Sequence, residues 1–255
     1  MKPAQLTRGA IGVLGALVLW QLVSSAHLAG DAFPSPVATL SALAADASGA
    51  SFWSAVGETV GVALLGLLGS AAAGILAGIV IGSSPAVRYA TLALLEFLKP
   101  IPPIVILPLL VLILGPTARM SWLLVFIGCL LPIITQTIAG VHDTDPVARD
   151  TARSYGMGRT EILFRVVLPS AMPFIGTAMR VAAPVALIVT VVAGLLGGGP
   201  GLGQGLYLAQ SSGNYPSLYG QVLVLGILGL IFIGLARAGE RRLLHWHPSY
   251  REAAV

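Results

Sequence analysis

Long, nearly uncharged apolar segments recur along this chain, separated by short stretches that hold most of its charges. Each segment exceeds the ~18 residues that an α-helix needs to cross a hydrocarbon layer about 30 Å thick. Inside hydrocarbon the backbone polar groups must be paired within the segment, which favours helices over an open sheet. We therefore predict an all-α membrane protein with about six transmembrane helices. The predicted spans are 9–28, 56–82, 89–114, 120–141, 173–196 and 219–237.

The third predicted span fits a straight transmembrane helix least well. Proline lacks a backbone donor and kinks or breaks a helix, so this span should be bent or broken. Glu96 and Lys99 also lie inside it, where charged groups are costly. The two side chains could neutralise each other, Lys99 could extend towards the cytoplasmic surface, or Lys99 could border a translocation path and attract an anion. The prolines concerned are Pro100, Pro102, Pro103 and Pro108.

The first predicted span follows Lys2 and Arg8, as the apolar region of a secretory signal does, and Ser24-Ser25-Ala26 offers small residues for cleavage. However, residues 9–30 carry no formal charge, which is longer than the about 7–15 residues of a signal-peptide apolar region. We predict an uncleaved transmembrane helix here.

Glycine recurs throughout the second predicted span. Small residues let helix backbones approach closely in lipid, so the pattern predicts tight packing either within this chain or between two copies. The glycines are Gly57, Gly61, Gly66, Gly69, Gly74, Gly78 and Gly82.

Composition supports a membrane location, and the placement of charge sets an orientation. Hydrophobic residues make up 56% of the sequence and charged residues 9%, against about a quarter in ordinary soluble domains. Six spans place both termini on one side, and eleven of the fourteen Lys and Arg residues fall on that side. The positive-inside rule therefore predicts that both termini are cytoplasmic. It also explains the net charge of +4 better than nucleic-acid binding, because no basic stripe carries interleaved aromatic residues.

A charged island at residues 149–169 interrupts the apolar pattern. Just before it, Asp145 and Pro146 form a favourable helix start, with Asp as the N-cap and Pro at the first helical position. Gly156 can adopt the left-handed conformation that ends a helix. The sequence therefore predicts a short, capped helix from Pro146 to Tyr155.

A second short helix should follow the flexible Gly158, with Glu161 and Arg165 paired one turn apart. Pro169 and Pro173 should then redirect the chain into the fifth span. Two functions fit such a pair of helices equally well: a mechanical contact with another protein, or a basic linker on anionic lipid headgroups.

The sequence holds no motif for enzymatic chemistry. A P-loop requires Gly-Lys followed by Ser or Thr, and the only lysines, Lys2 and Lys99, are each followed by proline. The H-E-x-x-H and G-x-S-x-G motifs do not occur. We predict no catalytic residue, no metal site and no cofactor bound by this chain. His245 and His247 are predicted to be part of an interfacial tail.

The charged island and several other segments form an ordered set of motifs. Asp150-Thr151-Ala152 is followed by Gly156 and then by Val166-x-Leu168-Pro169. The further segments are 97–103, 107–109, Thr137-x-Ala139-Gly140-Val141, Gly201-Leu202-Gly203 and 240–244. This order resembles the binding-protein-dependent ABC importer permeases of the nitrate, sulfonate and taurine group. Their EAA–G–I-x-L-P loop has Glu-Ala-Ala where this chain has Asp-Thr-Ala, and the resemblance covers roughly residues 57–246.

The resemblance implies a type I ABC importer permease fold in a bacterial plasma (inner) membrane, with the loop forming a cytoplasmic coupling helix. It divides the chain into 1–55 (first helix and outer segment), 56–246 (transmembrane domain) and 247–255 (cytoplasmic tail). The implied partners are two ATPase subunits that use ATP and Mg, an extracytoplasmic substrate-binding protein, a second permease copy and membrane lipid, with no nucleic acid. The implied ATPase-coupling residues are Asp150, Thr151, Ala152, Arg153, Tyr155, Gly156, Met157 and Gly158.

The resemblance also implies transport of a small anionic solute similar to a sulfonate, taurine or nitrate. We assign Glu96, Lys99, Pro102 and Pro103 to the translocation path, and Gly201, Gly203 and Gln204 to an outer gate. Many relatives carry Glu shortly before these glycines where this chain has Gly194, a departure that leaves the substrate open. The alternative function is an ATP-independent secondary transporter or channel that uses Glu96 and Lys99 as a charge relay.

Overall fold

The computed structural model describes residues 3–26 and 30–246, and every regular element within them is helical. The predicted tail 247–255, which includes His247, lies outside the described residues, as do residues 1–2 and 27–29. The elements in chain order are α1 (Pro3–Ser25), η1 (Gly30–Ala32), α2 (Pro36–Ala47), α3 (Ala50–Ser83), α4 (Pro85–Leu98), η2 (Pro103–Ile106), α5 (Leu107–Leu114), α6 (Ala118–His142), α7 (Pro146–Ser154), α8 (Arg159–Ile162), the π-helical turn η3 (Leu163–Val167), α9 (Leu168–Gly197), α10 (Leu202–Ser211) and α11 (Tyr215–Leu243).

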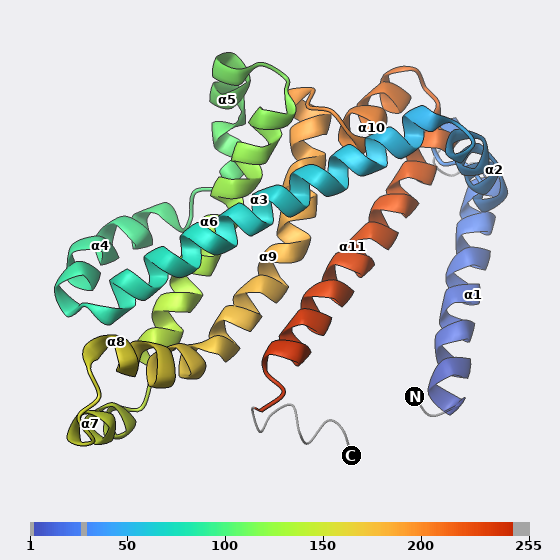
Figure 1. Ribbon diagram of the computed structural model, residues 1–255. Helices are drawn as coiled ribbons and strands as arrows, with labels where there is room; N and C mark the ends of the chain where they lie inside the picture. The colour runs from blue at the N-terminus through green and yellow to red at the C-terminus, as the bar shows by residue number, and fades with distance from the viewer. Residues whose placement is uncertain (1–2, 27–29, 247–255) are drawn as a thin grey trace.

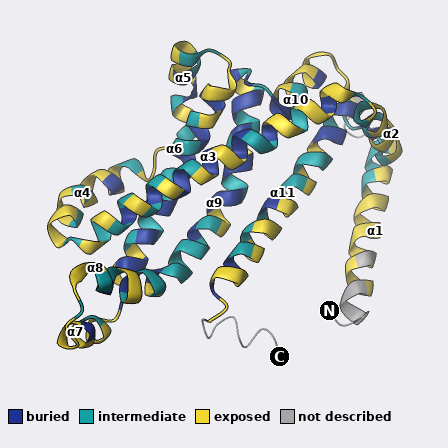
Figure 2. Cartoon of the chain, in the orientation of Figure 1, coloured by how far each residue is buried: buried dark blue, intermediate teal, exposed yellow. Residues whose placement is uncertain are grey.

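The long helices form one bundle with α6 at its centre (Figure 1). α6 packs against both α3 and α9, and α9 in turn packs against α11. Buried residues follow the facing surfaces of α3, α6 and α9, whereas α1 and α4 are largely exposed (Figure 2). α1 begins and α11 ends at the end of the bundle where α7 and α8 lie, and α2, α5 and α10 lie at the opposite end (Figure 1).

Five helical segments are long and apolar enough to cross a membrane, and α4 with α5 makes a sixth if the bent pair counts as one span. The number of predicted spans is therefore confirmed. Several helices extend beyond the predicted spans: α1 begins at Pro3, α3 at Ala50 and α9 at Leu168, and α11 ends at Leu243. Pro173 does not redirect the chain but lies inside α9, because neighbouring helices can compensate for a missing backbone bond in a transmembrane helix.

The predicted break in the third span is confirmed, and its place is now defined. α4 and α5 are inclined by 81° to each other. α4 ends at Leu98 with Lys99 as its C-cap, Pro102 is extended (φ −64°, ψ 132°), and η2 begins at Pro103. Three prolines within four residues remove the donors that a continuous helix would need.

Two short helices at the α10 end were not predicted. α2 begins at the N-cap Ser35, whose hydroxyl accepts a hydrogen bond from the Ala38 N–H at 3.2 Å. The Ser217 hydroxyl of α11 donates to the Asp46 carboxylate of α2 at 2.5 Å. α10 begins directly after Gly201 and includes the other two candidate gate residues, Gly203 and Gln204.

α1 touches the rest of the chain mainly through an aromatic group at the α10 end. Trp20 packs against Phe33 and Tyr219 with ring centroids 6.2 and 6.4 Å apart, and its indole N–H donates to the Pro34 carbonyl at 2.9 Å. The apolar length of α1 is otherwise exposed, as expected for a helix in contact with lipid.

A row of glycines explains how closely α3 approaches α6. A methyl group placed on Gly78 would lie 2.5 Å from the Cβ of Thr137, and one on Gly66 would lie 2.5 Å from Val125. Gly74 and Gly82 meet Ile133 and Val141 in the same way, at 2.8 Å each. These four glycines therefore serve packing within this chain, one of the two predicted alternatives. By contrast, Gly57 and Gly61 have open space around them.

We predict opposite effects for the same substitution at two positions of α3. Gly78→Ala should lower the free energy of unfolding by about 1–3 kcal/mol, because the added methyl overpacks the contact with Thr137. Gly57→Ala should leave it unchanged or raise it by up to about 1 kcal/mol, because alanine favours a helix more than glycine does. Thermal unfolding of both variants in detergent measures the difference. Equal midpoints would contradict the described contact between α3 and α6.

Candidate functional site

α7 forms a short, fully capped helix at the end of the bundle (Figure 1). Its N-terminus is capped as predicted, since the Asp145 carboxylate accepts from the Val147 N–H at 2.8 Å. Gly156 has a positive φ of 80°, also as predicted. Its N–H donates to the Arg153 carbonyl at 2.9 Å, and the Met157 N–H donates to the Ala152 carbonyl at 3.1 Å. This pair of bonds is a Schellman motif, which satisfies the last carbonyls of the helix.

A small apolar cluster fixes α7 to both neighbouring long helices. Ala152, which is 5% exposed, packs with Val141 at the end of α6 and with Ala171 near the start of α9. Ile162 and Val167 complete the cluster. This cluster therefore connects α7 with the end of α6 and the start of α9.

Polar contacts support the same arrangement. The Arg149 guanidinium donates to the Val141 carbonyl at the end of α6. The second predicted helix is present as α8 and η3, and the predicted pair of Glu161 and Arg165 is confirmed at 3.2 Å.

The two faces of α7 differ in what they contact. At about 100° per residue, Val147, Thr151 and Ser154 lie on one side, and all three are exposed. Arg149 and Ala152 lie on the other side, towards the bundle. The exposed side is rigid and open, so it can receive a partner without rearrangement of the chain.

The structure brings the eight candidate coupling residues together in one surface segment, although two of them face inward. Six of the eight residues are exposed, and Tyr155 is 81% exposed. Ala152 is buried and Met157 packs against the apolar cluster. These two residues hold the segment in place and do not contribute to its outer surface.

The candidate path residues lie at the break between α4 and η2. The Lys99 ammonium donates to the Glu96 carboxylate at 2.5 Å, and the side chains are 43% and 57% exposed. Pro103 lies against Gly128, near the middle of α6. The pair is therefore placed about halfway along the bundle, and neither side chain is buried within the chain.

The candidate gate residues belong to a tight junction of α10 with α3 and α9. Gly201 has a φ of 120°, and the N–H that follows it, that of Leu202, donates to the Thr59 hydroxyl at 2.8 Å. A methyl group on Gly203 would lie 2.2 Å from the Val191 carbonyl oxygen. Here glycine is required by the positive φ at one position and by the close approach at the other. Thr59 was missed in the sequence, where nothing connects it to a loop 140 residues away.

Gly194 and Gln204 lie at the same junction. A methyl group on Gly194 would lie 3.0 Å from the Gln204 backbone nitrogen, so the small residue allows α10 to rest on α9. The Gln204 side chain is exposed and lines a polar cavity with Asp46, Glu58 and Gln221. No Lys or Arg lines this cavity, which lies at the end opposite α7.

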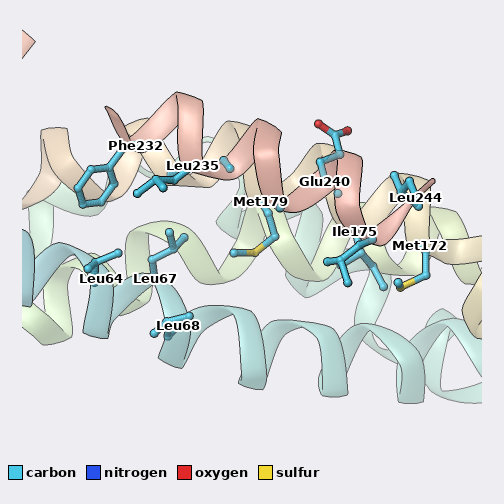
Figure 3. A pocket seen from close by; sticks show the side chains of 15 residues that line it. Leu64, Leu67, Leu68, Met172, Ile175, Met179, Phe232, Leu235, Glu240 and Leu244 are labelled. Carbon is cyan, nitrogen blue, oxygen red and sulfur yellow. The ribbon is translucent and has the colours of Figure 1, made fainter. Parts of the chain in front are cut away.

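An apolar groove lies between α3, α9 and α11 (Figure 3). Its volume is about 290 Å³, and leucine and methionine side chains dominate its lining, including Leu64, Leu67 and Met179. Glu240 is the one charged residue among the lining, and in Figure 3 its carboxylate points away from the apolar side chains. This groove offers no binding group to a small anion.

Glu240 instead forms an ion pair that joins α11 to α9. Its carboxylate lies 3.7 Å from the Arg180 guanidinium, and the two side chains are 3% and 43% exposed. The sequence analysis did not find this pair, because the two residues are 60 positions apart and no local spacing links them. Buried carboxylates are retained in proteins where a partner offsets the cost of desolvation.

Metal-binding clusters of three or more His, Cys, Asp or Glu side chains are absent from the part of the chain that the structure describes. His245 packs edge-on against Trp246 with ring centroids 5.1 Å apart.

The chain matches known proteins over most of its length. Residues 70–245 match the family model described as "Binding-protein-dependent transport system inner membrane component". The chain is 31% identical to the taurine transport system permease protein TauC of Escherichia coli (strain K12), over 96% of this chain and 91% of the relative. It is 26% identical to the nitrate import permease protein NrtB of Synechocystis, over 88% and 84% of the two chains.

The fold is also similar to a solved structure. A chain of the inward-facing MetNI methionine ABC transporter aligns with a TM-score of 0.67 and 18% identity, covering 76% of this chain and 96% of that chain.

We predict an asymmetry between the two partners of the ion pair that joins α9 and α11. Arg180→Met should destabilise the protein by about 1–3 kcal/mol, because it removes a positive charge beside a buried carboxylate. Glu240→Gln should cost less, because the long Arg180 side chain is half exposed and can extend towards the membrane surface. The measurement is the thermal midpoint of each variant in detergent. A larger loss for Glu240→Gln than for Arg180→Met would show that the pair is not the main support of Glu240.

Proposed function

Since this chain belongs to the family of binding-protein-dependent transport system inner membrane components, and is a multi-pass inner-membrane permease of the ABC importer type, we propose that α7 is the surface on which a separate ATPase docks. The observation that carries this proposal is the attachment of α7. A single buried cluster around Ala152 links the helix to the ends of both α6 and α9. ATP and Mg would be bound by the ATPase, and this chain would convert its motion into movement of the helices.

Membership of this permease family also implies an orientation in the membrane and further partners. The α7 end would face the cytoplasm, together with both termini, in agreement with the distribution of Lys and Arg. The opposite end, where α2 and α10 surround the polar cavity, would face the substrate-binding protein. The alternative of an ATP-independent carrier loses its basis, because the relatives over most of the chain are permeases of ATP-driven importers.

A second copy of this chain would complete the pathway along α4 and α5. These helices expose many large apolar side chains, such as Phe97 and Leu112, on either side of the pair of Glu96 and Lys99. A charged pair facing lipid would be costly, whereas one that borders a water-filled path between two copies would remain hydrated. The homodimer therefore explains why these charges lie halfway along the bundle.

The proposed substrate is a small anion similar to a sulfonate or nitrate, or a zwitterion with a sulfonate group such as taurine. This class is suggested by what TauC and NrtB are named to transport. In this chain Lys99 is the cationic group placed to attract such a solute at the break of the pathway.

We predict that Gly156→Val uncouples ATP hydrolysis from transport while the protein stays folded. A β-branched residue is strained at a φ of 80°, by about 1–2 kcal/mol, which displaces the end of α7 and should reduce transport about tenfold. The comparison variant is Gly158→Val in the same coupling segment, because Gly158 also has open space around it but has a φ of −70° that any residue can adopt. It adds the same side chain without backbone strain, so a difference between the two variants reports the strain at Gly156. The measurement is ATP-dependent uptake of taurine, sulfonates and nitrate by cells that express the complete transporter. Equal uptake by both variants would remove the support for docking at α7.

We predict that Lys99→Met reduces uptake of an anionic substrate about tenfold without reducing the amount of ATPase that co-purifies. The physical reason is the loss of the cationic group at the break of the pathway. Glu96→Gln is the control, since it keeps the positive charge and should retain uptake. If Lys99→Met transports as well as the unmodified protein, the path runs elsewhere.

A further inference from the structure

Two adjoining cavities lie where the ends of α3 and α6 meet α4, α7 and α8. Their volumes are about 610 and 420 Å³, and they share Ser83 and Arg149 in their linings. Arg153 and Arg159 line the larger one, and Arg88 lines the smaller one. We call the two together the arginine cavity. No Asp or Glu lines either part, so its charge is entirely positive.

Most of these guanidinium groups lack a carboxylate partner. Arg153 pairs with Asp150 at 2.7 Å, but Arg88, Arg149 and Arg159 form no ion pair with any described residue. Arg149 donates to the Val141 carbonyl, while its Nε is buried and makes no hydrogen bond. Several like charges around one cavity repel one another, so an anion bound among them would be stabilised. The planar guanidinium suits phosphate in particular, because it donates two parallel hydrogen bonds to it.

The surroundings of the arginine cavity favour an amphiphile over a free anion. Val141, Ile162, Leu163 and Val167 line its larger part and are apolar. Both parts of the cavity include Ser83, the last residue of the membrane-spanning α3, and Arg88 lies in the first turn of α4. This is the depth at which a membrane-spanning segment meets lipid headgroups. From this point α4 exposes apolar side chains, among them Tyr89 at 70%, along which an acyl chain can lie.

We propose that the arginine cavity binds the phosphate group of an anionic phospholipid in the membrane leaflet at the α7 end of the bundle. The lipid would neutralise arginines that come from three separate elements, α4, α7 and α8, and so hold α7 against the start of α4. The cavity lies on the Arg149 side of α7, away from the exposed side of Val147 and Thr151 proposed for the ATPase. The proposal therefore does not depend on ATPase docking, and a permease without partners can test it.

The experiment is a lipid titration of the purified permease by native mass spectrometry, with phosphatidylglycerol compared with phosphatidylcholine. The test variant is Arg88→Gln with Arg159→Gln, two side chains that make no described hydrogen bond to the fold. Each arginine should contribute about fivefold to the affinity, so the double variant should bind phosphatidylglycerol about 25-fold more weakly. Binding of phosphatidylcholine, which has no net charge, should change little.

The matched control is Arg241→Gln with Arg242→Gln. These arginines are exposed at the end of α11, on the same side of the bundle, and line neither part of the arginine cavity. The control should bind phosphatidylglycerol within about twofold of the unmodified protein. Thermal midpoints in phosphatidylcholine alone confirm that both variants are folded.

The source of the phosphate is distinguished by a competition with inorganic phosphate. Retention of phosphatidylglycerol in the presence of excess phosphate supports a lipid site. Displacement of the lipid by phosphate, with the same dependence on Arg88 and Arg159, would keep the phosphate site but assign it to a soluble ligand.

Two results would overturn the proposal. Equal weakening in the test and control variants would show general attraction to a basic surface. Unchanged lipid binding in the test variant, together with loss of ATPase co-purification, would assign these arginines to the ATPase instead.

Discussion

Everything in this structure depends on how closely α6 can approach its two neighbours. In lipid the helices gain little from burying apolar surface, so their association relies on close van der Waals contact. Glycines of α3 provide this contact on one side of α6, with Gly78 against Thr137. On the other side α9 presents alanines, such as Ala178 and Ala182, to the same core that holds Cys129 of α6. Larger side chains at these positions would separate the three helices and remove the frame on which the shorter helices rest.

The same contact reaches the α7 end of the bundle and links packing to function. Gly82 of α3 lies against Val141 of α6, and Val141 also packs with Ala152 of α7. The carbonyl of Val141 accepts the hydrogen bond from Arg149. Val141 therefore takes part in three contacts: with Gly82 of α3, with the apolar cluster that includes Ala152, and with the Arg149 guanidinium that lines the arginine cavity. A movement of α7 would therefore reach the end of α6 through Val141.

Local patterns predicted the fold well wherever the chain itself determines the structure. The spans follow from hydrophobicity, the caps of α7 follow from Asp145 and Gly156, and the break follows from clustered prolines. The pair of Glu161 and Arg165 follows from helical spacing. The two missed helices were missed for different reasons. α2 has a local start signal, Ser35 before Pro36, that was overlooked in the sequence. α10 depends on a distant contact, the bond from the Leu202 N–H to the Thr59 hydroxyl, which no local signal reveals. The inward direction of Ala152 also required the bundle, since the motif alone does not say which side of α7 faces it.

The distribution of charge along the bundle favours a transporter in which a separate binding protein delivers the solute and this chain provides the path. Three of the four ion pairs in the described part of the chain are local, between residues three or four positions apart, and only Arg180 with Glu240 connects two helices. Arg88, Arg149 and Arg159 lie together near α7 without a carboxylate partner among the described residues, whereas the polar cavity at the α10 end holds Asp46 and Glu58 and no basic residue. Such a cavity repels an anion that approaches from solution. An anionic solute must therefore be delivered at high local concentration, which is the role expected of a binding protein, and Lys99 would be the first cationic group that it meets inside. Selectivity for the anion would then rest mainly on the protein that delivers it, and the permease would provide a path along α4 and α5 with one attractive point at Lys99.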